Sequence, residues 1–445
     1  MDGDGLAENF SCLVETAGPY EAAPVVCAAV SGGGDSMALV LLLDGWARAK
    51  GGRVIALCVD HQLRDGSADE ARRVGGWLSQ RDIECHILNW ENPKGASALQ
   101  ENARMARYQL MERWCRDNGI LHLFLAHNAE DQAETFLMRL DKGSGPDGLS
   151  AMSPVSERRY CRFVRPLLAI SRQELRAVLD EQNQDWIEDP SNQNPRFERI
   201  RWRRTMTEQG LSADGFCRAA ERYGRTRVIV DRETARLSAR CVSVHPAGFI
   251  NLDREVFLAA PSELSERVLA RALMAVSGAM YPPRRHKTKQ LLDVVLSSQN
   301  IRRTLGGCCI DSTEGRILIS RELRSLPNPV PVSVGMNLIW DRRFRFCIGG
   351  AARHRPSPLF VQALGEQGDR DVRSLSLHST TNNIPRTARL SLPALMDGEG
   401  VLSVPHLNYR RAGENSHFPP FNPRIGGVVF QSLNSLSGSG YFVAY

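Results

Sequence analysis

Short apolar runs alternate with amphipathic stretches between about residue 23 and residue 165. The strand candidates are apolar runs at residues 25–30, 54–60, 83–88 and 121–126. Helical periodicity follows each run, starting near Ser36, Ser67, Ser97 and Asn128. The runs are continuously apolar rather than alternating, which is typical of strands covered by helices on both faces. The pattern therefore predicts an α/β domain with a doubly wound parallel sheet.

Three helix starts carry the pattern of a capping box, in which a side-chain oxygen and a later carboxylate or amide satisfy backbone donors. The predicted pairs are Ser67 with Glu70, Ser97 with Gln100, and Ser171 with Glu174. These pairs fix where three of the expected helices begin.

The pattern changes after residue 166. A helix is expected near residues 171–183, and helical periodicity dominates residues 205–300, most clearly at 265–277 and 287–297. Beyond these lie short strand candidates at residues 304–311, 316–321, 344–348 and 401–405, and a polar, Ser-rich segment at 365–385 that is expected to be a long loop. We expect a helical linker domain and then a small mixed or β-rich domain. The predicted division is an N-terminal extension at 1–22, an α/β domain at 23–204, a helical linker domain at 205–325 and a C-terminal domain at 326–445.

Composition narrows the class of protein without naming a function. A chain of 445 residues with 42% hydrophobic and 24% charged residues is typical of a multidomain globular protein. No apolar run approaches the roughly 20 residues of a membrane span, and the N-terminus lacks the pattern of a signal peptide. We therefore expect a cytoplasmic protein with no membrane partner. The net charge of +6 is compatible with nucleic-acid binding but too small to establish it.

The eleven cysteines do not form a recognisable metal or redox motif. No C-x-x-C pair occurs, and Cys308 and Cys309 are adjacent. Zinc ribbons, iron–sulfur sites and thioredoxin-like motifs therefore lack their ligand spacing.

A glycine-rich loop lies between the first expected strand and the first expected helix and reads Ser31-Gly32-Gly33-Gly34-Asp35-Ser36. Glycines let backbone N–H groups turn toward an anion, and the helix N-terminus adds a positive dipole end. The two serines offer hydroxyl donors. A carboxylate at Asp35 would be repelled by phosphate unless a Mg²⁺ ion bridged the two. The loop therefore predicts binding of a phosphate-bearing ligand together with Mg²⁺.

Two familiar nucleotide loops are excluded. A Walker loop needs Lys where this chain has Asp35, and the Rossmann fingerprint needs a third Gly where it has Met37. A second stretch, at residues 143–148, matches G-x-G-x-x-G by letter. It follows an expected helix rather than a strand, so we do not expect dinucleotide binding there.

These residues resemble the N-type ATP pyrophosphatase (PP-loop) superfamily, whose loop reads S-G-G-x-D-S. Further stretches are similar to the tRNA(Ile)-lysidine synthetases within it, over about residues 25–205. The matching stretches are residues 59–64 (V-D-H-Q-L-R), 101–108 (E-N-A-R-M-A-R-Y), 126–135 (A-H-N-A-E-D-Q-A-E-T) and 189–192 (D-P-S-N). The family often has Asp-Asp where this chain has Glu130-Asp131.

The resemblance implies a reaction and its participants. ATP adenylates the C2 carbonyl oxygen of the wobble cytidine of a tRNA(Ile) with a CAU anticodon. The ε-amine of free lysine then displaces AMP, and the product changes decoding from Met to Ile. The expected catalytic residues are Asp35, His127, Asp131, Arg107 and Arg201, with Asp35 and Asp131 also as Mg²⁺ ligands. The expected ATP-binding residues are Ser31, Gly32, Gly33, Gly34, Asp35, Ser36 and His61.

Contact with tRNA is expected from arginines on two helices. The expected tRNA-binding residues are Arg104, Arg199, Arg201 and Arg203. Around them, Phe197 and Trp202 lie among the arginines of residues 196–204, where aromatic rings can stack on unpaired bases. Residues 284–289 form a second basic segment.

Several of these residues have simpler interpretations. His127 could cap the following helix, and Arg104 could pair with Glu101 on a solvated face. The arginine-rich segment could be an ordinary basic helix end.

Three other functions remain open at the level of sequence. A tRNA thiolase of the same superfamily is disfavoured by the missing C-x-x-C pair. A small-molecule amide ligase would not require the arginine-dense segments. A non-catalytic RNA-binding protein would keep the loop and release no AMP. The oligomeric state is also open, with a homodimer among the alternatives.

Overall fold

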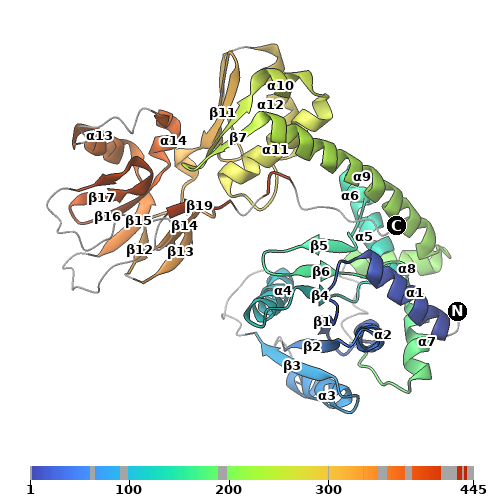
Figure 1. Cartoon of the computed structure of the whole chain (residues 1–445). Coiled ribbons are helices and arrows are strands. Elements are labelled where there is room, and N and C mark those ends of the chain that lie inside the picture. The colour runs from blue at the N-terminus through green and yellow to red at the C-terminus, as the bar shows by residue number, and fades with distance from the viewer. Residues whose placement is uncertain are drawn as a thin grey trace. The chain divides into compact units, whose positions relative to one another are not determined.

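The computed structural model describes residues 3–60, 66–90, 99–188, 198–298, 300–333, 335–348, 358–375, 383–411, 428–432 and 435–437. The contacts within the chain divide it into two compact units, the first ending at Ile229 and the second beginning at Val230. Figure 1 labels the elements of both. The predicted boundaries at residues 22, 204 and 325 remain predictions.

The first unit is built on a six-stranded sheet with strand order β3-β2-β1-β4-β6-β5. All neighbouring strands are parallel except β5, which runs antiparallel to β6 at one edge. The predicted doubly wound α/β class is therefore confirmed, with an antiparallel edge strand added. The strands are β1 (Val25–Val30), β2 (Arg53–Asp60), β3 (Glu84–Asn89), β4 (His122–Phe124), β5 (Val155–Glu157) and β6 (Arg162–Val164).

Helices pack on both faces of this sheet (Figure 1). On β1, Val26 and Ala28 face one core, and Cys27 faces the other. The first core includes side chains of α2 and α7, and the second includes Met111 and Cys115 of α4. The helices that lie wholly in this unit are α1 (Gly3–Thr16), α2 (Gly34–Ala49), α3 (Ser67–Ser79), α4 (Leu99–Asp117), α5 (Ala129–Asp141), α6 (Pro146–Leu149), α7 (Arg172–Glu181) and α8 (Glu198–Glu208).

The N-terminal helix α1 is part of the first core. Leu6, Phe10 and Val14 recur at a spacing of four residues and are all buried there. Residues 3–16 therefore belong structurally to the α/β unit, although the sequence separated them as an extension.

The helix starts agree only partly with the predicted caps. The Ser171–Glu174 capping box is present, with the Ser171 N–H donating to the Glu174 carboxylate over 2.9 Å. The Ser67–Glu70 box is wrong, because Gly66 is the N-cap and the Ser67 hydroxyl donates to buried Asp60 over 2.7 Å. Ser97 lies outside the described residues.

The G-x-G-x-x-G match at residues 143–148 follows α5 and runs into the four-residue helix α6. No strand precedes it, as the sequence predicted.

The second unit combines helices with three antiparallel sheets, of order β7-β8-β11-β10-β9, β12-β15-β16-β17-β18 and β13-β14-β19. Helix α9 (Ala213–Cys241) leads into it. Its strands are β7 (Val242–His245), β8 (Phe249–Asp253), β9 (Ile301–Leu305), β10 (Cys308–Thr313), β11 (Arg316–Arg321), β12 (Val330–Val332), β13 (Asn337–Trp340), β14 (Phe344–Cys347), β15 (Leu359–Ala363), β16 (Pro393–Asp397), β17 (Gly400–Val404), β18 (Tyr409–Arg410) and β19 (Val428–Phe430). Its helices are α10 (Arg254–Ala259), α11 (Ser262–Ser277), α12 (Arg285–Ser297), α13 (Gly365–Leu375) and α14 (Arg386–Leu390).

Three expectations for this part of the chain were wrong. The stretch at 205–300, expected to be helical, contains the helices α9 to α12 but also the hairpin β7–β8, which the sequence did not predict. The single strand expected at 304–311 is two strands, β9 and β10, joined at Gly306 and Gly307, which both have positive φ. The loop expected at 365–385 begins with helix α13, whose buried Val372 packs in an apolar cluster. A short helix with few apolar residues is hard to distinguish from a polar loop by pattern alone.

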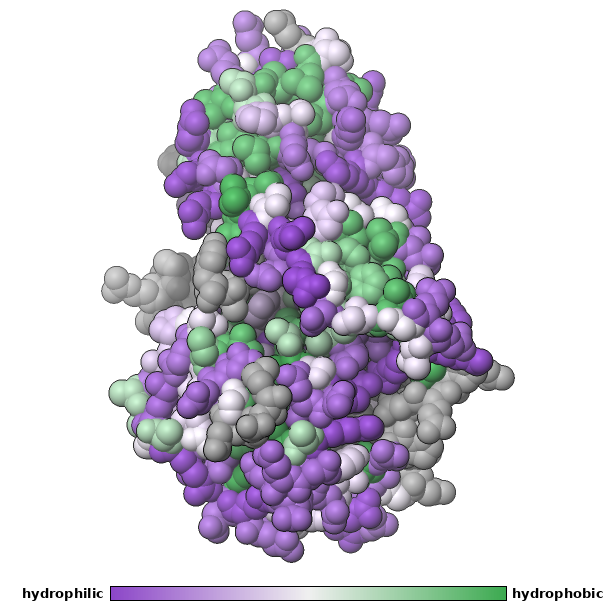
Figure 2. Space-filling view, turned by 90° about the vertical axis from the view of Figure 1, so that its right-hand side faces the viewer, coloured by the Kyte–Doolittle hydropathy of each residue, from purple (hydrophilic) through white to green (hydrophobic). Residues whose placement is uncertain are grey.

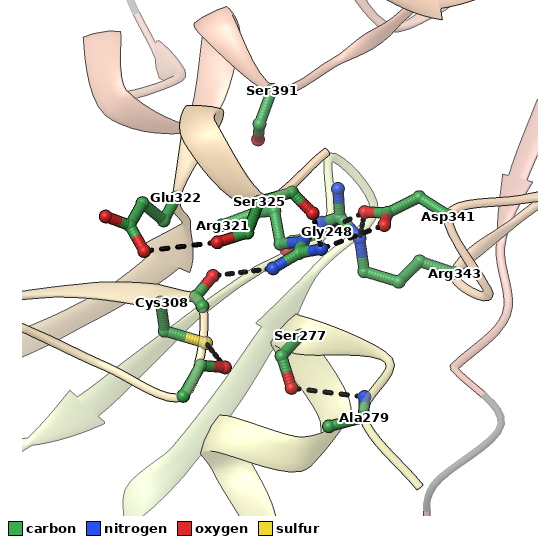
Figure 3. Close-up of polar contacts among 12 residues, drawn as sticks. Gly248, Ser277, Ala279, Cys308, Arg321, Glu322, Ser325, Asp341, Arg343 and Ser391 are labelled. Carbon is green, nitrogen blue, oxygen red and sulfur yellow. Dashed lines mark hydrogen bonds and ion pairs between the residues drawn. The ribbon is translucent and has the colours of Figure 1, made fainter. Parts of the chain in front are cut away.

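A buried ion cluster lies inside the second unit (Figure 3). Asp341 accepts two hydrogen bonds of 3.0 Å from the Arg321 guanidinium and one of 2.6 Å from Arg343 Nε. Arg343 is fully buried and also donates to the Gly248 carbonyl. Burial lowers the pKa of Arg343 to about 10, and Asp341 acts in the opposite direction. One carboxylate therefore holds two guanidinium groups away from water.

Acid is expected to destabilise the second unit through His406. Burial lowers the pKa of this imidazole, which lies edge-on to Phe344, to about 4. A histidine whose pKa is lower in the folded state than in the unfolded state does not affect stability above the unfolded pKa, near 6.5. As the pH falls from 6.5 toward 4, the unfolded state binds a proton that the folded state does not, and the free energy of unfolding falls by up to about 3 kcal/mol. Hydrogen exchange measured between pH 7 and 4.5 should show this loss in the wild type and not in His406→Gln. His286→Gln, at an exposed histidine, should behave like the wild type; equal pH dependence in all three proteins would contradict the assignment.

The face in Figure 2 carries hydrophilic residues interspersed with small hydrophobic patches. Among the described residues, no helix is both long and apolar enough to cross a membrane.

Candidate functional site

The glycine-rich loop joins β1 to α2 and is closed by its two serines. The Ser36 hydroxyl accepts from the Ser31 backbone N–H over 3.1 Å and donates to the Gly33 carbonyl over 2.8 Å. The two serine hydroxyl oxygens are 3.3 Å apart. Gly33 is the N-cap of α2 and provides no side-chain cap. The Ser36 N–H donates back to the Gly33 carbonyl over 3.0 Å, so the N–H groups of Gly34 and Asp35 are the donors at the start of α2 that an anion can approach.

Gly32 is held by contacts from distant parts of the chain. Its φ of +83° lies in the left-handed region. A Cβ atom there would lie 2.7 Å from Val74 Cγ2 and 2.9 Å from Ile187 Cδ1. The Gly32 carbonyl accepts a 2.8 Å hydrogen bond from the Ile187 N–H. The conformation of the loop thus depends on α3 and on the segment after α7.

A second helix start faces the same edge of the sheet. Asn128 follows β4 and caps α5 in a capping box, in which the Asp131 N–H donates to the Asn128 side chain over 3.0 Å. The cap is therefore Asn128 and not His127, which is half-buried beside it. Asn128 is fully buried, and its side chain lies close enough to the Asp35 carboxylate to lower the pKa of that group.

The two helix starts meet at the switch point of the sheet. The connection from β1 leads to β2 on one side, and β4 lies on the other side. Open α/β sheets bind ligands at this position, outside the carboxyl ends of the strands. The predicted loop and the predicted His127–Asp131 segment therefore lie at one site.

Asp35 and Asp131 interact across this site. Burial raises the pKa of Asp35, Arg172 lowers it, and Asp131 raises it further. The Arg172 Nε atom is 3.4 Å from Asp35 Oδ2. An anionic ligand would bring additional negative charge to this pair, so a cation is needed to balance it.

Two carboxylates are a suitable protein contribution for Mg²⁺. This ion commonly takes one or two carboxylates and completes its shell with water and substrate phosphates. No cluster of three or more metal-binding side chains occurs among the described residues. The available donors fit Mg²⁺ bound together with a nucleotide.

Two further ion-pairing residues of the site were not assigned roles from the sequence. Glu134 is buried one turn beyond Asp131 and accepts a 2.7 Å hydrogen bond from Arg203 Nε. Burial raises the pKa of Glu134, and Arg203 lowers it. Arg172 begins α7, where its N–H donates to both oxygens of Glu130 over 3.1 and 3.0 Å. Glu130 thus holds the start of α7 against α5.

A cavity of about 350 Å³ opens beside these residues. Its polar lining consists of carboxylate and hydroxyl side chains and one basic side chain, that of Arg203. The lining residues with polar side chains are Glu130, Glu134, Ser171, Glu174, Arg203, Thr207, Ser212 and Asp214. The second oxygen of Glu134 is buried and has no hydrogen-bond partner among the described residues.

Comparison with known proteins identifies the family. A family model described as a PP-loop domain matches residues 7–209. The tRNA(Ile)-lysidine synthase of Wolbachia sp. subsp. Brugia malayi is 33% identical over 93% of this chain and 95% of its own length. The synthase of Anaplasma marginale is 32% identical over 86% of this chain and 85% of its own. That of Ruegeria pomeroyi is 36% identical over 71% and 75%.

The chain belongs to the tRNA(Ile)-lysidine synthase family.

Two segments meet at this site: the glycine-rich loop, and the segment from β4 into α5 that includes Asp131. Both lie in stretches of sequence that resemble this family. The position where the family often has Asp is occupied here by Glu130. The extra methylene still allows both carboxylate oxygens to bond the α7 backbone. Glu130 therefore has a structural role that the sequence left undecided.

The remaining predicted residues are placed less completely. Arg107 of α4 and Arg201 of α8 are exposed, and Arg199 is half-buried. Arg203, expected to contact tRNA, is paired with Glu134. His61, the side chain of Arg104 and residues 189–197 lie outside the described residues.

The indole of Trp202, expected as a stacking surface, packs against an apolar cluster that includes Ala133 and Leu137 of α5. It therefore stabilises the contact between α5 and α8.

Proposed function

We propose that this protein ligates lysine to the wobble cytidine of tRNA(Ile) with a CAU anticodon, using ATP and releasing pyrophosphate and AMP. The observation that carries the proposal is the meeting of the glycine-rich loop with the Asp131 segment at the switch point of the sheet, in a chain of this family. Such a ligation changes decoding from Met to Ile. Because tRNA is the substrate, we also propose a cytoplasmic location.

Each group at the site has a task in this reaction. The backbone donors that begin α2 bind phosphate oxygens, and Arg172 lies close enough to Asp35 to approach the same phosphates. Asp35 and Asp131 would hold Mg²⁺, which would neutralise the charge that accumulates during adenylation. The proposed catalytic set remains Asp35, His127, Asp131, Arg107 and Arg201, with ATP contact from His61 and tRNA contact from Arg104, Arg199, Arg201 and Arg203.

The acidic cavity supports lysine as the second substrate. An ammonium group is a multiple donor that requires acceptors, and the cavity is lined by four carboxylate side chains, those of Glu130, Glu134, Glu174 and Asp214. Glu134 lies one turn along α5 from Asp131, so a lysine bound there would be close to the adenylated base. We therefore propose that Glu134 binds an ammonium group of free lysine.

Replacing Glu134 with Gln is expected to raise the KM for lysine by at least tenfold. The substitution keeps the shape and removes the charge that strengthens the hydrogen bond to an ammonium, a change of about 1.5–3 kcal/mol. The KM for ATP should change little. Steady-state kinetics with varied lysine and varied ATP separate the two effects.

Asp214→Asn at the exposed rim of the same cavity is the matched control and should leave the KM for lysine nearly unchanged. An unchanged KM for lysine in Glu134→Gln would place the ammonium elsewhere.

The reaction is tested with purified protein, ATP, Mg²⁺, radiolabelled lysine and an unmodified tRNA(Ile) transcript bearing CAU. We expect acid-stable label in the RNA, dependent on ATP and lost in Asp35→Ala. Release of AMP without incorporated label would keep the adenylation and replace lysine by another nucleophile. Neither label nor AMP would refute the proposal and favour a non-catalytic RNA-binding protein. Size-exclusion chromatography with light scattering tests whether the enzyme is a homodimer.

A further inference from the structure

The outward face of α9 carries a stripe of arginines. The residues along it, called the arginine stripe below, are Arg218, Arg222, Arg225, Arg232, Arg236 and Arg240, with Ile229 between them. They follow one another at intervals of three, four or seven residues. At 3.6 residues per turn they fall within about 80° around the helix axis and extend for about 33 Å along it. All of these residues are exposed.

The opposite face of α9 is buried. Ala220, Thr234, Leu237 and Cys241 are buried, and Phe216 and Tyr223 pack against an apolar cluster. Arg227 also lies on this face and donates to the Asp147 carbonyl and the Ser150 hydroxyl. The helix is therefore fixed by its inner face, and the arginine stripe is not needed to hold α9 in place.

Only half of the stripe has acidic partners. Arg218 pairs with Asp214, Arg225 with Glu221 and Arg236 with Glu233 on the same helix. Arg222, Arg232 and Arg240 form no ion pair among the described residues. Like charges three or four residues apart destabilise a helix by a few tenths of a kcal/mol per pair. An external anion would convert this repulsion into attraction.

We propose that the arginine stripe binds the phosphate backbone of the tRNA, at a surface separate from the wobble-cytidine site. The inference rests on the proposed function for the identity of the RNA. Guanidinium groups in a row provide the salt-dependent, sequence-independent contacts that position an RNA. A stripe of this length follows several phosphates rather than a single one. A membrane does not fit, because a membrane-bound amphipathic helix needs a free apolar face and that of α9 is buried.

The test is the triple variant Arg222→Ala/Arg232→Ala/Arg240→Ala in the full-length chain. Alanine maintains the helix, and the ion-paired arginines are left intact. Binding of the tRNA(Ile) transcript is measured by filter binding at several salt concentrations. We expect Kd to rise by about 10- to 100-fold, and the slope of log K against log salt to become shallower by about two to three.

The matched control removes three exposed arginines of the first unit that lie outside α9, one at the start of β2 and two near the end of α4. The triple Arg53→Ala/Arg113→Ala/Arg116→Ala has the same loss of charge and should keep the wild-type slope. A second variant, Arg222→Lys/Arg232→Lys/Arg240→Lys, keeps the charge and should bind nearly as the wild type does. It also separates lost phosphate contacts from a damaged helix.

The outcomes distinguish this inference from the proposed function. If the wild type ligates lysine to tRNA and the alanine triple binds with unchanged Kd and slope, the stripe has another partner, such as an acidic protein, and the inference is wrong. Equal losses in the control triple would show a general charge effect and would also overturn it. If the wild type neither binds nor modifies the tRNA, the proposed function itself is refuted, and the inference with it.

Discussion

Replacing Gly32 with alanine is expected to reduce kcat/KM for ATP by at least about 100-fold, because a small displacement at a catalytic centre has consequences of that size. The new methyl group would lie 2.7 Å from Val74 and 2.9 Å from Ile187, neither of which can move without disturbing the first core. Alanine also disfavours the positive φ of this position. The assay is tRNA-dependent release of AMP, with the melting temperature recorded in parallel.

Gly34→Ala is the control for this substitution. Its Cβ atom would lie 3.6 Å from Leu179 and Trp186, which is ordinary van der Waals contact, and φ at this position is not positive. We expect a loss of less than about tenfold, equivalent to less than about 1.4 kcal/mol of the barrier. Equal activity of the two variants would mean that the loop does not need the left-handed conformation at Gly32.

The second large effect concerns stability rather than catalysis. Asp341→Asn is expected to lower the free energy of unfolding of the second unit by about 3–5 kcal/mol, because it leaves two buried guanidinium groups without an anion. Asparagine tolerates the positive φ of 49° at this position, so the turn between β13 and β14 is not itself disturbed. Hydrogen exchange at the amides of β13 and β14 measures the loss locally.

Asp293→Asn is the matched control, since Asp293 lies on the exposed side of α12 in the same unit. Surface substitutions of this kind usually change stability by less than about 0.5 kcal/mol. If Asp341→Asn were as stable as this control, the ion cluster would not contribute to the fold.

Local signals in the sequence predicted the α/β unit well. The run at residues 25–30 coincides with β1, because a strand buried on both faces is apolar at every position. These signals failed where a side chain bonds outside its own segment. Ser67 has the spacing of a capping residue, but its hydroxyl donates to Asp60 instead. They also failed for α13, which has too few apolar residues to be distinguished from a loop.

The site was predicted in part for the same reason. The loop and Asp131 belong to contiguous stretches, so pattern and resemblance both found them. Arg172 was missed because it reaches Asp35 across 137 residues of chain, and nothing in its neighbours indicates that contact. Glu134 lay within a recognised stretch, but only its burial and its pairing with Arg203 reveal its role. The Asn128 cap could have been found, since Asn128 and Asp131 have the spacing of a capping box.

The hydrogen bond between the Ile187 N–H and the Gly32 carbonyl also sets an order of events during biosynthesis. The glycine-rich segment leaves the ribosome early, but the partner that fixes its conformation is translated on the order of ten seconds later. Until then the nascent chain contains the sequence of the glycine-rich loop without the hydrogen bond that fixes its conformation. A chain truncated before Ile187 would therefore contain the whole S-G-G-G-D-S sequence but lack this contact.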